Sequence, residues 1–527
     1  MRRSLIVVWG CVTALSACSA SEVVQDATTS TPSSTAPVTT AVEDATTTTD
    51  VVAVAMPRFE TDDCISPELI SLSRSSTHDI ECGFVVVPEN REVPDGPTVR
   101  LPVAIARTRS PNPEPDPVIY LAGGGGHAHL TYAHLLLASV GDAVLEKRDF
   151  IQYNQRGAPG TEPVLECAGY TEFLFSLAAR PEVGSLWSVE HDDYLDDCRQ
   201  TLAGRGIDLT QYNSATNAID ARDVRIALGY EEANYYGTSY GTRLGLALLR
   251  DHPEGVRSII LDSVYPPEAG YYSEFARSLD RAFGEVFDAC TADDECAAAY
   301  PDLESDFLAT VDRLNDEPQM VNSPFGPVSV DGGIFMDAMA IYLYPPELIP
   351  RSPAAMATVA AGDLQPVEMV VAGAVTSPEI SWNMFYAMQC REEVPFESYE
   401  EAMDVAAGLP SQIISHYLEA FTRFHFDMCA RSLSGAADPV EARAVTSEIP
   451  ALVLAGRFDP ATPPTWSQAT AASLGNATYL EFPTLGHGIM RSSPCGLEIG
   501  LAFIDDPSTT PDTACIEELE PISFETN

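Results

Sequence analysis

The sequence predicts an α/β fold, in which a mostly parallel sheet is wrapped by helices and carries an inserted, mainly helical cap domain. Short apolar runs alternate with helical stretches up to residue 264, as they do around parallel strands. Helical segments then dominate residues 265–448. Apolar strand runs return only at 451–455 and 477–482. We therefore expect a sheet domain in two parts, 57–264 and 449–527, with a cap at 265–448.

The N-terminus predicts export. Two arginines precede an apolar run at 5–15, which is too short for a stable membrane anchor and is typical of a signal peptide. The run ends in Leu-Ser-Ala-Cys, which resembles the lipobox of bacterial lipoproteins. We expect residues 1–18 to be this signal, with Cys18 as the lipid anchor on the extracytoplasmic face of a bacterial membrane. A secreted protein with an incidental cysteine is the alternative.

Residues 19–56 are rich in Thr, Ser and Ala and nearly free of large apolar side chains, which predicts a disordered tether. The formal net charge of -48 repels nucleic acid, so we expect no nucleic-acid partner. A strongly hydrated surface explains this charge better than a dedicated cationic partner does. The sequence does not indicate an oligomeric state.

Beyond the signal, the cysteines predict disulfides, because an even number remains in a chain expected to be exported. No Cys-x-x-Cys motif occurs, which argues against a metal site. Pairing neighbours along the chain is a guess, since sequence does not fix connectivity. The pairs are then Cys64 with Cys82, Cys167 with Cys198, Cys290 with Cys296, Cys390 with Cys429, and Cys495 with Cys515.

Several elements of the first part can be placed from their patterns. The first two strands are expected at 83–87 and 99–105. A helix at 217–228 is expected to use Asn217 and Asp220 as a capping pair. Further strands are expected at 118–121, 150–153 and 256–261, and a helix at 130–145.

The central motif is Gly-Thr-Ser-Tyr-Gly at 237–241. A short strand precedes it and a helix follows, as in a nucleophile elbow, where a serine occupies a strained turn. Ser239 is the expected nucleophile. The alternative is a glycine-rich turn without chemistry.

A serine hydroxyl needs a base, and the base needs an acid that orients it. In the α/β-hydrolase fold the order along the chain is Ser, then Asp or Glu, then His. Asp459 follows the strand run at 451–455, and His487 follows the one at 477–482. We predict Asp459 as the acid and His487 as the base.

The oxyanion formed during such a reaction needs two backbone N–H donors. One is expected from Tyr240, which follows the nucleophile. The other is expected from the four glycines at 123–126, with Gly124 favoured and Gly125 next. His127, His129 and His134 follow this loop, but no carboxylate or thiolate stands beside them, so we predict neither a metal site nor a cofactor.

These residues resemble the exported tripeptidyl/prolyl aminopeptidases of the α/β-hydrolase fold. The similarity extends over about residues 64–515 and is most specific in the elbow, the acid loop at 456–463 and the cysteine pattern. Other matching segments are 82–88, 217–229, 260–264 and 290–300. The resemblance implies a serine exopeptidase with Ser239, Asp459 and His487 as its triad.

Two loops depart from the family pattern. Gly125 stands where the family's Gly-Gly-Pro-Gly has proline, and the segment 154–161 has Asn in place of the family's Asp, with Ala-Pro inserted. The triad is unaffected, so we expect these changes to bear on substrate choice.

An aminopeptidase must also bind a protonated amine, which requires carboxylates near the cleft. In the family these come from the cap, and Cys-Arg-Glu-Glu at 390–393 resembles that site. Glu392, followed by Glu393, is the expected ligand. The alternative is a pair of solvated glutamates on a helix.

We therefore expect a serine peptidase acting on peptide substrates. An esterase or lipase with the same triad is the second hypothesis, and a non-catalytic binding protein is the third.

Overall fold

The computed structural model describes residues 57–526, apart from 76, 183, 325 and 375–379. The predicted signal peptide, Cys18 and the tether lie outside the described residues. Within the described part of the chain, none of the helices is both long and apolar enough to cross a membrane.

A nine-stranded sheet forms the centre, in the order β1-β2-β3-β5-β4-β6-β7-β10-β11. Its first strands pair antiparallel, and every pair from β5–β4 to β10–β11 is parallel. The strands are β1 Arg58–Thr61, β2 Ile80–Pro88, β3 Thr98–Ala106, β4 Val118–Leu121, β5 Phe150–Tyr153, β6 Ala233–Ser239, β7 Val256–Val264, β10 Ala451–Gly456 and β11 Ala477–Phe482. The predicted fold class is confirmed. An edge strand, β1, precedes the two strands that were expected to come first.

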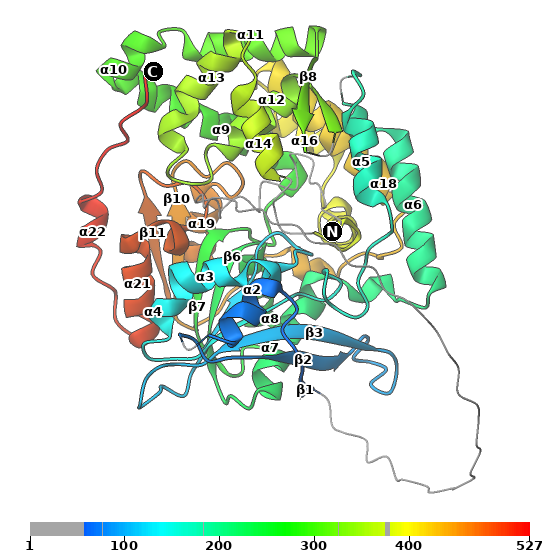
Figure 1. Ribbon diagram of the computed structural model, residues 1–527, viewed down its shortest axis with the longest axis vertical. Coiled ribbons are helices and arrows are strands. Elements are labelled where there is room, and N and C mark those ends of the chain that lie inside the picture. The colour runs from blue at the N-terminus through cyan, green and yellow to red at the C-terminus, as the bar shows by residue number, and fades with distance from the viewer. Residues whose placement is uncertain (1–56, 76, 183, 325, 375–379, 527) are drawn as a thin grey trace, which may run out of the picture.

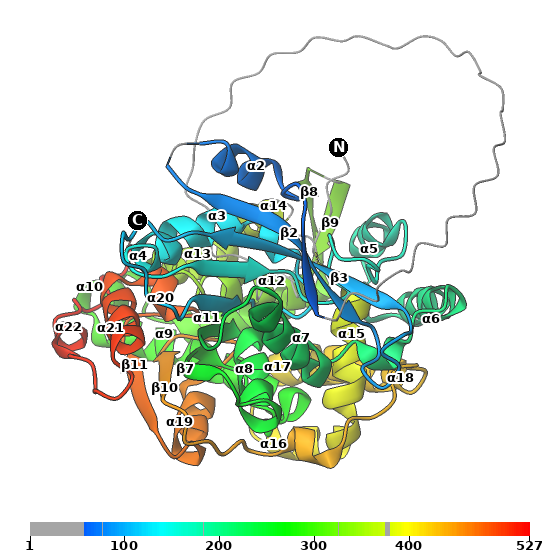
Figure 2. The same cartoon turned by 90° about the horizontal axis from the view of Figure 1, so that it is seen from below.

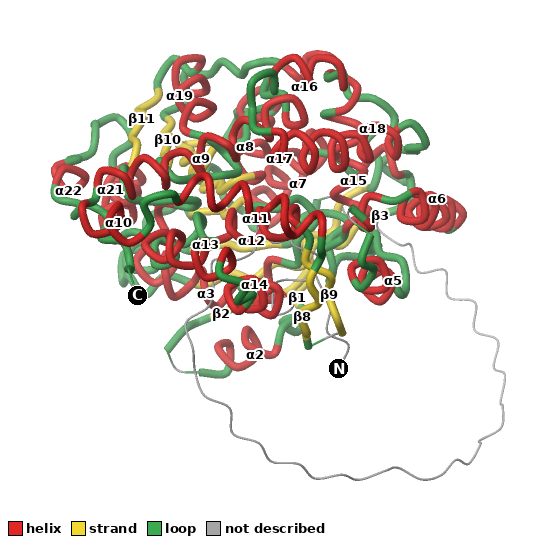
Figure 3. The backbone as a smooth tube through the Cα atoms, turned by 90° about the horizontal axis from the view of Figure 1, so that it is seen from above, coloured by secondary structure: helices red, strands yellow, loops and turns green. Residues whose placement is uncertain are grey.

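Helices cover both faces of the sheet (Figure 2 and Figure 3). Helices α7, α8 and α19 share one apolar cluster with the sheet, while α3, α4, α20 and α21 share another on the opposite face. The helices outside the cap are α2 Pro67–Ser73, α3 Ala133–Leu136, α4 Asp142–Val144, α5 Tyr170–Ala178, α6 Val189–Gly204, α7 Ser214–Ala227, α8 Tyr240–Asp251, α19 Pro464–Ser473, α20 Ile489–Ser492, α21 Pro494–Asp505 and α22 Ala514–Glu517. The helix expected at 130–145 is divided by a π-helical turn, Leu137–Gly141.

The cap gathers at one end of the molecule (Figure 1). Its own apolar cluster also takes in Leu174 of α5, Leu195 of α6 and Phe524 near the C-terminus, so it draws on more of the chain than 265–448. Its elements are α9 Tyr271–Ala292, α10 Asp294–Ala299, α11 Leu303–Asp316, the hairpin β8 Gln319–Ser323 and β9 Gly326–Val330, α12 Gly332–Ile341, α13 Ser352–Ala360, α14 Gln365–Ala374, α15 Trp382–Glu392, α16 Tyr399–Val405, α17 Ser411–Ile414 and α18 Arg423–Cys429.

Five disulfides join the neighbouring cysteines expected from sequence. Two of them bear on the cap. Cys290–Cys296 closes the junction of α9 with α10, and Cys390–Cys429 ties α15 to α18. A cross-link of this kind stabilises a fold mainly by restricting the unfolded chain.

The capping prediction for α7 is wrong. The helix begins one turn earlier, because the side chain of Asn213 accepts the N–H of Thr216 and supplies the N-cap. Asn217 and Asp220 lie inside the helix and are fully buried. Asp220 instead accepts hydrogen bonds from Arg156, at 2.7 Å from Nε and 2.9 Å from Nη2. Arg91 makes a further ion pair with Asp220.

We expect the buried ion pair of Asp220 and Arg156 to contribute strongly to the stability of the fold. Burial alone would raise the pKa of Asp220, but Arg156 and Arg91 outweigh burial and hold it below its ordinary value. Asp220→Ala leaves Arg156 buried without its partner. We expect the free energy of unfolding to fall by about 3–5 kcal/mol, measured by chemical denaturation. Glu190→Ala, which removes the exposed pair with Arg180, is the matched control and should leave the denaturation midpoint unchanged. Equal effects of the two variants would contradict this prediction.

Candidate functional site

Ser239 occupies the strained turn predicted for a nucleophile elbow. It ends β6, and its backbone has φ 57° and ψ -126°, in a region that costs free energy for a residue other than glycine. Helix α8 begins at the next residue. A Cβ atom at Gly241 would collide with the carbonyl oxygen of Leu121, so only glycine lets α8 approach β4 this closely. The turn therefore presents Ser239 at the carboxyl end of the parallel strands.

Asp459 and His487, which are 28 residues apart, lie side by side at the same edge of the sheet. His487 Nδ1 is 2.8 Å from Asp459 Oδ2, and both side chains are buried. Asp459 also accepts the Thr462 hydroxyl at 2.6 Å and the N–H groups of Ala461 and Thr462. Burial raises the pKa of Asp459, but His487 and the Thr462 hydrogen bonds outweigh it, so the pKa lies below its ordinary value. Asp459 is therefore held as a carboxylate facing the imidazole.

The second imidazole nitrogen of His487, Nε2, is buried and makes no hydrogen bond with any residue that the structure describes. The ring is nevertheless fixed, because its backbone N–H bonds the carbonyl of Tyr344 at 3.1 Å and the Tyr344 ring lies 4.9 Å from it, centroid to centroid. Tyr344 belongs to the cap. The structure therefore leaves Nε2 available for a proton transfer while the cap supports the ring.

The glycine loop after β4 lies directly beside Ser239. A Cβ atom at Gly123 would come within 3.1 Å of Ser239 Cβ, and Gly124 and Gly125 line the same cavity as Ser239 and Tyr240. The structure thus brings the predicted oxyanion residues together with the serine. Backbone N–H groups from two sides of a hydroxyl are the arrangement that oxyanion stabilisation needs.

The loop that departs from the family pattern supports the glycines. Gln155 accepts the N–H of Gly126 at 3.3 Å and donates to the carbonyl of Ala122 at 2.7 Å. From the cap, the N–H of Ser381 bonds the carbonyl of Gly126 at 2.9 Å. The glycine loop is therefore held from the sheet on one side and from the cap on the other.

A cavity lies between the elbow and the cap. Counted together with the open solvent at its mouth, the space between the atoms is about 660 Å³. Ser239, Gly124 and Gly125 contribute to its core side, and residues of α9 and α15 form its cap side.

Glu392 and Glu393 lie behind this cavity, and neither forms part of its wall. Glu392 accepts the backbone N–H and the hydroxyl of Ser214, each at 2.5 Å, and lies 3.2 Å from Arg243 Nε. Glu393 forms an ion pair with Arg243 Nη2 at 2.7 Å. Both carboxylates are buried, so the alternative of two solvated glutamates is wrong. Their binding of a substrate amine remains a prediction.

The three histidines near the glycine loop belong to no candidate metal cluster among the described residues. Burial lowers the pKa of His127 to about 3 and that of His129 to about 4. The ring nitrogen Nε2 of His129 is 2.8 Å from Gln152 Oε1. Among the described residues no group of three or more His, Cys, Asp or Glu side chains could hold a metal ion.

Sequence reasoning missed two residues at the end of β7. Asp262 accepts the N–H groups of Ile489 at 2.7 Å and Met490 at 3.1 Å, and Ser263 Oγ accepts the N–H of Gly488 at 2.8 Å. Together they hold the three residues that follow His487. Ser263 has φ 61°, a second positive value outside glycine. The sequence showed an Asp at a strand end, within the segment 260–264 that resembles the family, and neither feature indicates this role.

Comparisons with known proteins find similarity to α/β-hydrolases and to serine peptidases. A family profile described as "alpha/beta hydrolase fold" matches residues 116–329, and one described as "TAP-like protein" matches 417–515. The serine protease Hip1 of Mycobacterium bovis is 27% identical over 218 residues, which are 40% of this chain and 41% of Hip1. The tripeptidyl aminopeptidase of Streptomyces lividans is 30% identical over 196 residues, 36% of each chain.

The chain therefore matches less than half the length of these relatives. Among solved structures, the proline iminopeptidase of Mycobacterium smegmatis aligns over 80% of this chain and 98% of its own, with 17% identity and a TM-score of 0.39.

We expect Asp262→Asn to release the segment after His487. An amide in place of the carboxylate sets its NH2 group against a backbone N–H that now has an acceptor. Hydrogen exchange at the amides of residues 488–490 should quicken by about tenfold or more, read by mass spectrometry or NMR. Asp506→Asn, which changes an exposed Asp that caps Ser508, is the control and should leave exchange at 488–490 unchanged. Unaltered exchange in Asp262→Asn would refute the role.

A pH dependence of stability follows from Glu393. Burial raises its pKa from 4.5 to about 8, ahead of the opposing effect of Arg243. Between these values the folded protein keeps a proton that the unfolded chain releases, so the free energy of unfolding falls as pH rises. Glu393→Gln keeps the shape of the protonated acid but has no proton to release. We therefore expect the fall in the free energy of unfolding between pH 5 and pH 8 to be smaller in this variant by at least about 1.4 kcal/mol. Chemical denaturation at each pH measures the free energy of unfolding. The exposed Glu401→Gln should retain the wild-type slope.

Proposed function

Because this chain is an α/β-hydrolase-fold protein whose sequence is similar to serine peptidases, we propose that it is an exported serine aminopeptidase that cleaves peptide bonds near free N-termini. The observation that carries the proposal is the buried Asp459–His487 pair at the edge where Ser239 occupies its strained turn. Each group has the chemistry that acyl transfer requires.

The proposed reaction begins when Ser239 Oγ attacks the scissile carbonyl and His487 Nε2 takes its proton. Asp459 accepts the Nδ1–H bond and stabilises the imidazolium that forms. The N–H groups of Tyr240 and Gly124, with Gly125 as the alternative, bind the oxyanion. His487 then gives the proton to the leaving amine. Water, activated in the same way, hydrolyses the acyl-enzyme.

The proposal extends to the segments that the structure does not describe. We assign residues 1–18 to a lipoprotein signal, Cys18 to the anchor on the extracytoplasmic face of a bacterial membrane, and 19–56 to a tether. Five disulfides in the described chain support an oxidising compartment. We divide the remainder into a sheet domain at 57–264 and 449–527 and a cap at 265–448.

A second candidate is a carboxylic ester hydrolase with the same triad. One observation favours it: none of the described residues in the cavity wall carries a charged side chain. In an aminopeptidase the substrate's ammonium needs a carboxylate, and the buried pair predicted for this role, Glu392 and Glu393, already faces Arg243.

Digestion of a peptide library tests the proposal. Wild-type protein should shorten peptides with free N-termini and leave acetylated copies intact, as read by mass spectrometry. Ser239→Ala and Asp459→Asn should each lower kcat by about 10⁴-fold, because one removes the nucleophile and the other holds His487 in the wrong tautomer. Thr77→Ala, at an exposed position, is the control. Cleavage that ignores acetylation refutes the aminopeptidase, and faster turnover of simple esters than of any peptide favours the second candidate.

A further inference from the structure

The cavity beside Ser239 has walls of aromatic side chains from both parts of the fold. The core contributes Tyr240 and Trp466, and Tyr265 stands at the start of the cap segment. The cap contributes four more: Tyr271 and Phe275 from α9, and Trp382 and Phe385 from α15. Aromatic faces on two sides of a space remove an apolar group from water at little cost in conformational entropy.

Charged groups are kept out of this space. Among the lining residues that the structure describes, none has a charged side chain. The carboxylates that approach it are already in use: Glu393 pairs with Arg243, and Glu274 accepts the indole N–H of Trp466 at 2.6 Å. A substrate side chain bearing a charge would therefore lose its hydration here without gaining a partner.

The amide oxygen of Gln389 is a polar atom of the wall that lacks a partner. Gln389 is 4% exposed, and its Oε1 makes no hydrogen bond with any described residue. It lies on α15 between the aromatic residues of that helix and the Glu392–Arg243 contact. A buried amide oxygen without a donor is unfavourable until one is supplied, and a terminal amide can both donate and accept. A peptide backbone offers both groups.

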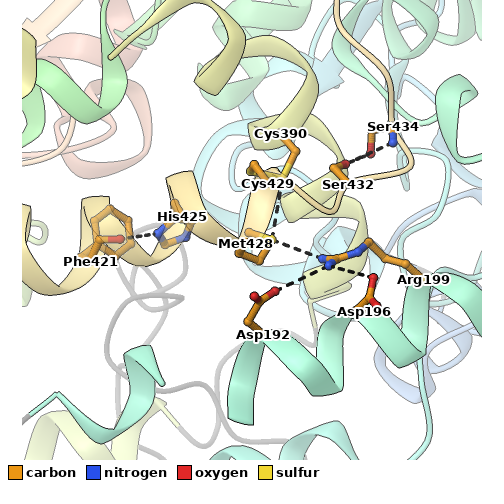
Figure 4. Close-up of a disulfide and its surroundings, with 10 residues drawn as sticks. All are labelled: Asp192, Asp196, Arg199, Cys390, Phe421, His425, Met428, Cys429, Ser432 and Ser434. Carbon is orange, nitrogen blue, oxygen red and sulfur yellow. Dashed lines mark hydrogen bonds and ion pairs between the residues drawn. A yellow bond between two sulfur atoms is a disulfide. The ribbon is translucent and has the colours of Figure 1, made fainter. Parts of the chain in front are cut away.

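The helix that carries Gln389 is fixed in place. The next residue, Cys390, is bonded to Cys429 of α18 (Figure 4). Beside that disulfide, Arg199 Nη1 donates to the sulfur of Met428 at 3.2 Å, which ties α6 to the same point. The cavity wall on α15 is therefore held from two sides, and its side chains form a preorganised surface.

We propose that this cavity binds the acyl side of the substrate, that it selects an aromatic or large aliphatic residue next to the scissile carbonyl, and that Gln389 hydrogen-bonds the substrate backbone. The proposal rests on the proposed function for its reacting serine. It adds the substrate class, which follows from the aromatic walls, the absence of charge in the described wall and the unpartnered amide.

Fluorogenic amides test the selection. Free amino acid and tripeptide amides with Phe, Leu, Ala, Lys or Glu next to the leaving group are compared by kcat/KM. Phe and Leu should exceed Ala by about tenfold, and exceed Lys and Glu by about a hundredfold or more. Equal turnover of Lys or Glu and Phe would overturn the proposal.

Variants of Gln389 test the amide. Gln389→Glu places a carboxylate in the wall at nearly constant volume, so the ratio of kcat/KM for Lys to that for Phe should rise at least tenfold. Gln389→Leu should raise KM for all the peptide amides by about tenfold with kcat nearly unchanged. Gln412→Leu, on the cap but outside the cavity, is the matched control and should change neither value. A Lys-to-Phe ratio unmoved by Gln389→Glu would remove Gln389 from the site.

Binding separates this proposal from the proposed function. Ser239→Ala protein is titrated with the same unlabelled tripeptides by calorimetry. If wild-type protein cleaves no peptide, yet the variant binds Ala-Ala-Phe at least tenfold more tightly than Ala-Ala-Lys, the peptidase activity fails and the selection stands. If the variant binds the two tripeptides equally, the proposed selection fails, whether or not the wild-type protein cleaves peptides.

Discussion

The site depends on the close approach of the elbow to strand β4. Gly241 brings α8 against the carbonyl of Leu121, and that contact sets where the turn at Ser239 lies. The turn is then locked by Thr242, whose hydroxyl donates to the carbonyl of Ser239 at 2.6 Å and accepts the N–H of Tyr265 at 2.8 Å. Strand β4 also leads directly into the glycine loop. A single contact between backbones therefore sets the serine and its oxyanion loop relative to each other, and it offsets the strain of a positive φ.

The loop of His487 is positioned by a similar arrangement at the end of β7, the strand next to β6 in the sheet. Ser263, at the end of β7, also has a positive φ, which turns its hydroxyl toward the amide of Gly488. Asp262 beside it accepts two more amides, and burial raises its pKa while those amides lower it. Two strained serines at adjacent strand ends thus serve the same edge, Ser239 as the proposed nucleophile and Ser263 as support for the loop of His487. Strain of this kind persists only where surrounding hydrogen bonds determine the conformation.

Sequence was sufficient where the signal is local. Apolar runs were enough to place β4, β5 and β10. Because Asp459 and His487 each follow a strand, the sequence also predicted that they lie at one edge of the sheet. It was insufficient where a partner is distant. Asn217 and Asp220 read as a helix cap because their pattern is that of a first turn, whereas Asp220 is held by Arg156, 64 residues away. The packing of α5 and α6 against the cap was missed for the same reason. An apolar face in the sequence does not indicate which surface that face will cover.

Arg243 joins the two parts of the site and accounts for the burial of two acids, Glu392 and Glu393. It belongs to α8, the helix that follows the nucleophile, and it meets Glu392 and Glu393 at the end of α15 while stacking 4.9 Å from the Tyr265 ring. Because a guanidinium is charged at any physiological pH, it fills the position that a substrate ammonium needs. The contact of the cap with the elbow and the proposed capture of an amine thus depend on the same acidic groups. If these acids bind a substrate ammonium as proposed, the ammonium must weaken the contact that holds α15 over Ser239, and recognition of the amine is then coupled to the shape of the cavity through one arginine.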